Sequence, residues 1–106
     1  MEFKNLMLNF WDNHDFRNRT FAQVYKDFAL SGIRLEKGSL EKCSSIKQLE
    51  NVIAPIINEQ NLKHLLYTVD LKDDVAERSN RLVTSMITRI AFKVFLRTYF
   101  TSKYGY

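Results

Sequence analysis

Four carboxylates fall within eight consecutive positions of the chain, at Asp70, Asp73, Asp74 and Glu77. Hard cations such as Mg²⁺ prefer oxygen ligands, and Asp73 and Glu77 would share one helix face at i, i+4 spacing, so a metal site is one interpretation. The stronger interpretation is structural, because carboxylates in the first turn of a helix cap free N–H groups and complement the positive end of the helix dipole. We therefore expect the start of a helix here and no metal ion.

Candidates for nucleophilic or acid–base chemistry are few: the histidines are His14 and His64, and the cysteine is Cys43. Nothing in their spacing requires a shared site. Lys42 and Lys47 flank Cys43 and would lower its pKa somewhat, yet a cysteine in such a capping region is usually inert. Three scattered glycines form no phosphate loop, and no zinc-ligand spacing occurs. The sequence favours a non-catalytic protein over an enzyme, with no catalytic residue, metal or cofactor expected.

The positive charge of the chain is concentrated towards its C-terminal end. The 29 positions after Glu77, the last acidic residue, carry six basic side chains: Arg78, Arg81, Arg89, Lys93, Arg97 and Lys103. Positions 1–77 hold ten basic and twelve acidic residues, a balance of −2, so these six cations bring the formal net charge to +4. We therefore expect an anionic or acidic partner to bind this part of the chain.

One helix of roughly 30 residues, over about residues 73–102 and about 45 Å long, is expected to carry these cations. Arg89, Lys93 and Arg97 form an i, i+4 ridge without an intervening acid. Repulsion along the ridge costs roughly 0.2–0.5 kcal/mol per pair, so we expect carboxylates elsewhere in the fold, a partner, or water and counterions to compensate it. At about 100° per residue, the other side of the helix is an apolar arc that we expect to face the core, made of Val83, Ile87, Ile90, Ala91, Val94 and Phe95.

Apolar and aromatic side chains interrupt the basic half of this helix, so both kinds are candidates for binding. The candidate residues are Arg81, Arg89, Lys93, Arg97, Phe92, Leu96, Tyr99 and Phe100. Such a mixture suits a protein interface, or a nucleic acid whose phosphates meet cations and whose bases stack on rings. The competing interpretation is that the rings pack under shorter helices while the basic stems reach solvent. Membrane binding is not expected, because the apolar residues are too evenly divided between the two faces.

Apolar residues also recur at helical spacing along the rest of the chain. Four stripes approximate the i, i+3, i+4, i+7 pattern of amphipathic helices, within residues 3–11, 21–29, 46–57 and 62–69. Phe10 and Trp11 in the first stripe are expected to fix the N-terminus to the bundle.

Helix boundaries are predicted from residues that cap or interrupt helices. Gly32 is placed to stop the second helix, and Pro55 either kinks the third or separates two helices. Residues 31–44 are expected to form a loop, with a short hairpin around Gly38 as the alternative. Three pairs resemble capping boxes, namely Thr20 with Gln23, Ser45 with Gln48, and Asp74 with Glu77.

These patterns predict an all-α fold, a compact bundle of four to five helices in which short amphipathic helices pack on one long C-terminal helix. With 106 residues, we expect a single domain over 1–106. The lone Cys43, together with the lack of a signal-peptide pattern or an apolar run long enough to span a membrane, predicts a soluble cytoplasmic chain.

The expected function is that of a small protein-interaction module. The excess length of the C-terminal helix and its aromatic content away from the core suggest a protein partner or self-association into a homo-oligomer. The alternative is a nucleic-acid-binding protein that uses Arg81, Arg89, Lys93 and Arg97.

Overall fold

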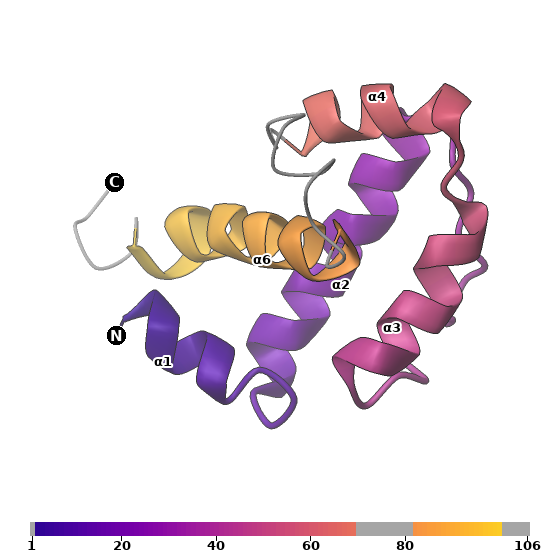
Figure 1. Cartoon of the computed structure of the whole chain (residues 1–106). Coiled ribbons are helices and arrows are strands. Elements are labelled where there is room, and N and C mark those ends of the chain that lie inside the picture. Colours follow the sequence, from indigo (N-terminus) through magenta and orange to yellow (C-terminus); the bar gives the residue numbers. More distant parts are fainter. Residues whose placement is uncertain (1, 70–81, 101–106) are drawn as a thin grey trace.

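Every regular element in the described part of this computed structural model, residues 2–69 and 82–100, is a helix (Figure 1). The side chains of Glu59, Tyr99 and Phe100 are not among those described. The all-α prediction is therefore confirmed. The elements in chain order are α1 (Phe3–Leu8), α2 (His14–Leu30), α3 (Ile46–Ile53), the 3₁₀ turn η1 (Ala54–Ile56), α4 (Glu59–Thr68), α6 (Leu82–Phe95) and the π-helical turn η2 (Leu96–Phe100).

Helices α2 and α6 form the centre of the bundle. They cross one another and pack together more extensively than any other pair of separate helices (Figure 1). Helix α6 also contacts α1 and α3, while α4 packs on α2. The 14 residues of α6 continue into the five of η2, which confirms a long C-terminal helix as the element on which other helices pack. Helix α2, with 17 residues, is longer than the short partner that was predicted.

The apolar arc predicted for the C-terminal helix faces the core as expected. All six of its residues are buried, and Met86 on the same side is fully buried as well. They belong to a hydrophobic cluster that contains side chains from all five described α-helices. The predicted start and end of this helix, near residues 73 and 102, lie outside the described residues.

The start of α2 differs from the sequence prediction. Asn13 is the N-cap, and its side chain accepts a hydrogen bond from the Phe16 N–H at 3.2 Å. Thr20 lies inside the helix, fully buried, and its hydroxyl donates to the Phe16 carbonyl at 2.8 Å. The predicted capping box of Thr20 and Gln23 is therefore wrong, because a threonine can satisfy its hydroxyl against the carbonyl four residues back.

The end of α2 is a Schellman motif built on Gly32. The Gly32 N–H donates to the Ala29 carbonyl at 3.1 Å and the Ile33 N–H to the Phe28 carbonyl at 2.9 Å, which satisfies two free carbonyls of the last turn. Gly32 has φ of +79°, a left-handed conformation that costs glycine little. The predicted stop is confirmed, and no strand forms between residues 31 and 44, so the hairpin alternative is wrong.

Pro55 separates two helices rather than kinking one. Helix α3 ends at Ile53, Pro55 lies in the 3₁₀ turn, and Ile57 is extended before α4 begins. Asn58 and Asn61 form a reciprocal capping box at the start of α4. The capping box predicted for α3 is confirmed in part: the Ser45 side chain accepts from the Gln48 N–H at 3.3 Å, but Gln48 Oε1 accepts from the Ser44 N–H at 2.6 Å instead of from the Ser45 N–H.

Phe10 connects the N-terminal helix region to the core. It is 4% exposed, and its ring lies edge-on to those of Trp11, Phe16 and Phe21, with centroids 5.1–6.0 Å apart. We expect Phe10→Ala to lower the free energy of unfolding by about 3–5 kcal/mol, because it removes a buried ring and leaves a cavity. Leu8→Ala, at a position 74% exposed, should change it by less than about 0.5 kcal/mol in the same urea denaturation experiment. Equal effects of the two substitutions would show that α1 is not docked as described.

Candidate interaction site

Lys93, a predicted binding residue, forms a largely buried ion pair within the molecule. Its Nζ lies 2.9 Å from Oδ2 of Asp27 on α2, and the two side chains are only 17% and 4% exposed. Nζ also lies 3.5 Å from the Thr68 carbonyl at the end of α4. Part of the charge on the basic ridge is thus compensated by a carboxylate from another helix, one of the three compensations considered for it.

Gln23 connects this ion pair to the surface. Its Nε2 donates to Oδ1 of Asp27 at 2.8 Å, while its Oε1 accepts from Nη1 of Arg97 at 3.0 Å. Asp27 therefore accepts from both Gln23 and Lys93. The Arg97 guanidinium is held in place by a neutral amide, which leaves its positive charge uncompensated by that contact.

Phe92 and Arg89 are engaged with other side chains of the same molecule. The Phe92 ring packs edge-on against Phe3 of α1, with centroids 5.1 Å apart, and stacks on Phe95 at 6.2 Å. The Arg89 guanidinium lies 5.8 Å from the centroid of the Phe92 ring, within the range of a cation–π interaction. Phe92 is partly buried against the core. Its position therefore agrees with the competing interpretation, in which the aromatic rings pack inside the molecule.

The remaining predicted binding residues are Arg81, Leu96, Tyr99 and Phe100. Arg81 falls outside the described residues, and so do the side chains of Tyr99 and Phe100, although their backbone belongs to η2. Leu96 is 36% exposed on the same turn as Arg97. Binding through these residues stays a prediction.

A basic groove lies between α2 and the end of the C-terminal helix. It is a hollow of about 280 Å³ with three cationic side chains around it, Arg19 and Lys26 from α2 and Arg97 from η2. Ala22 and Val94 contribute apolar surface to the same hollow. We call these five residues the basic groove.

The cations of the basic groove differ in how their charge is balanced. Arg19 Nε lies 3.1 Å from Oδ1 of Asp15 in an exposed pair, which offsets its charge. Lys26 is exposed and makes no hydrogen bond or ion pair with the described residues, and Arg97 contacts neutral Gln23. The groove therefore keeps an excess of positive charge over a partly apolar surface, which suits an acidic partner.

Sequence reasoning missed the contribution of α2 to this site. Arg19 and Lys26 are seven residues apart, so they share one face of a helix. That spacing was the available signal, but it does not show that this face adjoins Arg97, because the crossing of α2 and α6 decides it.

The pKa of the Cys43 thiol shifts in the direction opposite to the one expected. The thiol is buried, and this burial raises its pKa, with the nearby Glu41 carboxylate adding to the effect. The expected lowering by Lys42 and Lys47 is therefore wrong, since desolvation of the thiolate outweighs the flanking positive charges. Sγ of Cys43 lies 3.6 Å from the Ser39 carbonyl oxygen, to which the thiol is a weak donor.

The other chemical candidates do not come together in the described part of the chain. His14 begins α2 and His64 lies on α4, both exposed. No group of three or more metal-ligating side chains occurs among residues 2–69 and 82–100. The carboxylates from Asp70 to Glu77 lie outside these ranges. None of the helices that are described is long and apolar enough to cross a membrane.

No protein-family model, curated protein or solved structure matches this chain.

Removing one partner of the Lys93–Asp27 pair is expected to destabilise the fold by about 3–5 kcal/mol, because the other charge stays buried without a partner. Lys93→Met and Asp27→Leu each test this in urea denaturation, and the double variant, with both charges gone, should recover most of the loss. Lys26→Met, at an exposed position of α2, is the matched control and should change stability by less than about 0.5 kcal/mol. If Lys93→Met were as mild as Lys26→Met, the ion pair would not be buried as described.

The Cys43 thiol is expected to react slowly in the folded protein. Because the folded thiol has a raised pKa, it holds its proton to a higher pH than the unfolded one. The stability that this group contributes therefore declines as pH rises above about 8.5. Alkylation by iodoacetamide at mildly alkaline pH should be at least about tenfold slower in native buffer than in urea. Equal rates would contradict the burial of Cys43.

Proposed function

We propose that this chain is a non-catalytic protein-interaction module that binds an acidic segment of another protein molecule in the basic groove, and that this molecule is a second copy of the chain. The observation that carries the proposal is the convergence of Arg19, Lys26 and Arg97 from two helices around one hollow. Because charge complementarity steers association and selects partners, such a surface favours an acidic partner.

The chain itself supplies an acidic sequence of the required kind. Positions 70–77 carry four carboxylates, and the only cation among them is Lys72. The acidic segment, positions 70–77, and the residues of the basic groove are separate in the sequence. The acidic segment of one copy could therefore bind the groove of another, in a head-to-tail or a reciprocal contact. Self-association through the C-terminal helix was also the expectation from its length and composition.

Nucleic-acid binding is the second candidate, and the same three cations favour it. Among the described residues that line the groove, none has an aromatic side chain. Phe92, a ring on which a base was expected to stack, instead packs against Phe3 and Phe95. Because the described lining offers cations but no ring on which a base could stack, we place this function second.

Charge reversal in the groove tests self-association. We expect the wild-type chain to form dimers or larger oligomers in sedimentation equilibrium at low salt, and to dissociate as salt screens the contact. Lys26→Glu combined with Arg97→Glu should weaken association by about tenfold or more, since repulsion replaces attraction at two positions. Lys47→Glu combined with Lys63→Glu gives the same net charge at exposed positions that do not line the groove, and should associate like the wild type.

A complementary variant identifies the partner segment. Asp73→Lys combined with Asp74→Lys should also be monomeric on its own, and mixing it with the groove variant should restore association by pairing the two reversed surfaces. A strict monomer at high concentration and low salt would refute self-association. The nucleic-acid alternative would be favoured instead if the chain bound a fluorescent single-stranded oligonucleotide and the groove variant did not. In that case the logarithm of the binding constant should fall linearly with the logarithm of the salt concentration.

A further inference from the structure

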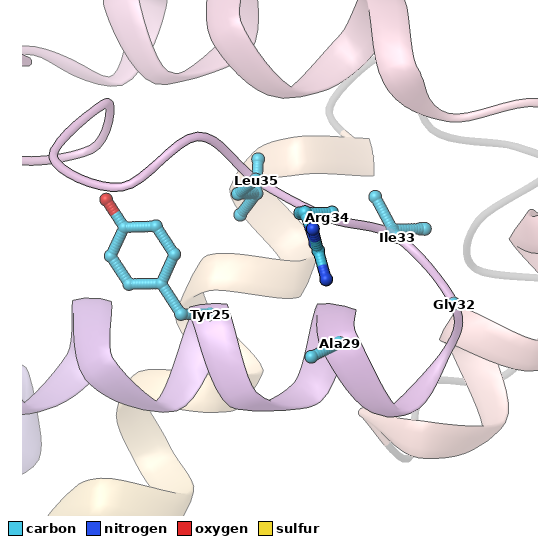
Figure 2. A pocket seen from close by; sticks show the side chains of 6 residues that line it. All are labelled: Tyr25, Ala29, Gly32, Ile33, Arg34 and Leu35. Atoms are coloured by element: carbon cyan, nitrogen blue, oxygen red, sulfur yellow. The ribbon is translucent and has the colours of Figure 1, made fainter.

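A second cavity lies on a different side of α2, under the segment that follows this helix. After Gly32 the chain turns back along α2 and borders a hollow of about 300 Å³ that is open to solvent on one side, since Ala29, Gly32 and Arg34 are exposed (Figure 2). This volume is at the lower end of the range for small-molecule sites. The lining residues are Tyr25 and Ala29 of α2 together with Gly32, Ile33, Arg34 and Leu35 of the returning segment.

The returning segment is fixed at both ends, so the cavity is formed in advance of any ligand. At one end the Schellman motif holds Gly32 and Ile33 against the last turn of α2. At the other end the Tyr25 hydroxyl accepts from the Leu40 N–H at 3.1 Å and donates to Oε2 of Glu41 at 2.7 Å. Ile33 and Leu40 are buried in the core, which ties both anchors to the hydrophobic cluster. A preformed cavity lowers the conformational cost of binding.

Arg34 gives this cavity its chemical character. Figure 2 shows its side chain extending from the returning segment towards α2, above Ala29. Among the described residues the guanidinium has no hydrogen bond and no ion pair with any other group. A guanidinium is a planar fork of donors that matches a carboxylate in two parallel hydrogen bonds.

The remaining walls suit an apolar body attached to that carboxylate. Ala29 and Leu35 offer aliphatic surface, and the Tyr25 ring offers a planar one (Figure 2). Burial raises the pKa of the Tyr25 phenol, so this wall stays neutral. The Glu41 carboxylate lies beyond the phenol hydroxyl, to which it is hydrogen-bonded, and does not line the cavity.

We propose that the cavity between α2 and residues 32–35 binds a small organic carboxylate with a flat apolar body, its carboxylate paired with Arg34 and its body against Tyr25, Ala29 and Leu35. This site is separate from the basic groove and does not depend on the proposed self-association. For a ligand of about ten heavy atoms, we expect a Kd on the order of 1 mM.

A titration followed by ¹⁵N–¹H correlation spectra tests the site with phenylacetate as the probe. The expected result is a saturable shift of the amide signals of Ala29, Gly32, Arg34 and Leu35. Phenylacetamide, which has the same body without the charge, should bind at least about tenfold more weakly, since a charge-assisted contact to Arg34 is lost.

Substitutions then separate this site from general attraction to a basic protein. Arg34→Gln should reduce the affinity for phenylacetate by about tenfold or more, whereas Lys37→Gln, which removes a neighbouring exposed charge outside the lining, should leave it unchanged. The proposal would be overturned if phenylacetate and phenylacetamide bound equally well, or if Arg34→Gln and Lys37→Gln lost the same affinity for phenylacetate. It would also be overturned if phenylacetate caused no saturable shift at concentrations well above 1 mM.

Discussion

The ion pair between Lys93 and Asp27 fixes how the two central helices meet. Apolar side chains in a core define how close α2 and α6 lie, but such contacts are not directional. A buried charge, in contrast, is tolerated only where its partner is in place, so the 2.9 Å contact adds a directional constraint to the rotation of α6 that its apolar arc favours. Because Lys93 faces inward in that rotation, Arg97, four residues later, is left at the edge of the same helix pair, where Gln23 holds it.

Helix α2 organises both proposed sites, one on each of two faces. Arg19, Ala22 and Lys26 recur at spacings of three and four residues and contribute one wall of the basic groove. Tyr25 and Ala29, again four residues apart, contribute a wall of the cavity under residues 32–35. A third face, with Phe16, Val24 and Phe28, is buried in the core. A helix that is buried along one face can present different chemistry on each of its other sides, provided that neighbouring segments enclose the space.

Local patterns in the sequence predicted the elements and the core better than they predicted the contacts between elements. The arc from Val83 to Phe95 could be predicted because helical geometry alone decides which side chains share a face. The role of Gly32 could be predicted for a similar reason, since a glycine directly after an apolar stripe is typical of the left-handed residue that ends a helix. The start of α2 was missed because Thr20 and Asn13 are both plausible caps, and burial of Thr20 decided between them. The partner of Lys93 was not predictable, because Asp27 lies 66 positions away in the chain.

The position of Trp11 has a practical consequence. It is the only tryptophan of the chain, its indole lies edge-on to Phe10 and tilted against Phe21, and its carbonyl accepts a hydrogen bond from Arg17. The indole therefore sits at the junction of the N-terminal segment with α2, half shielded from water. Its intrinsic fluorescence is a built-in optical reporter of that junction, so undocking of the first helix can be followed in the unlabelled protein as a change in emission.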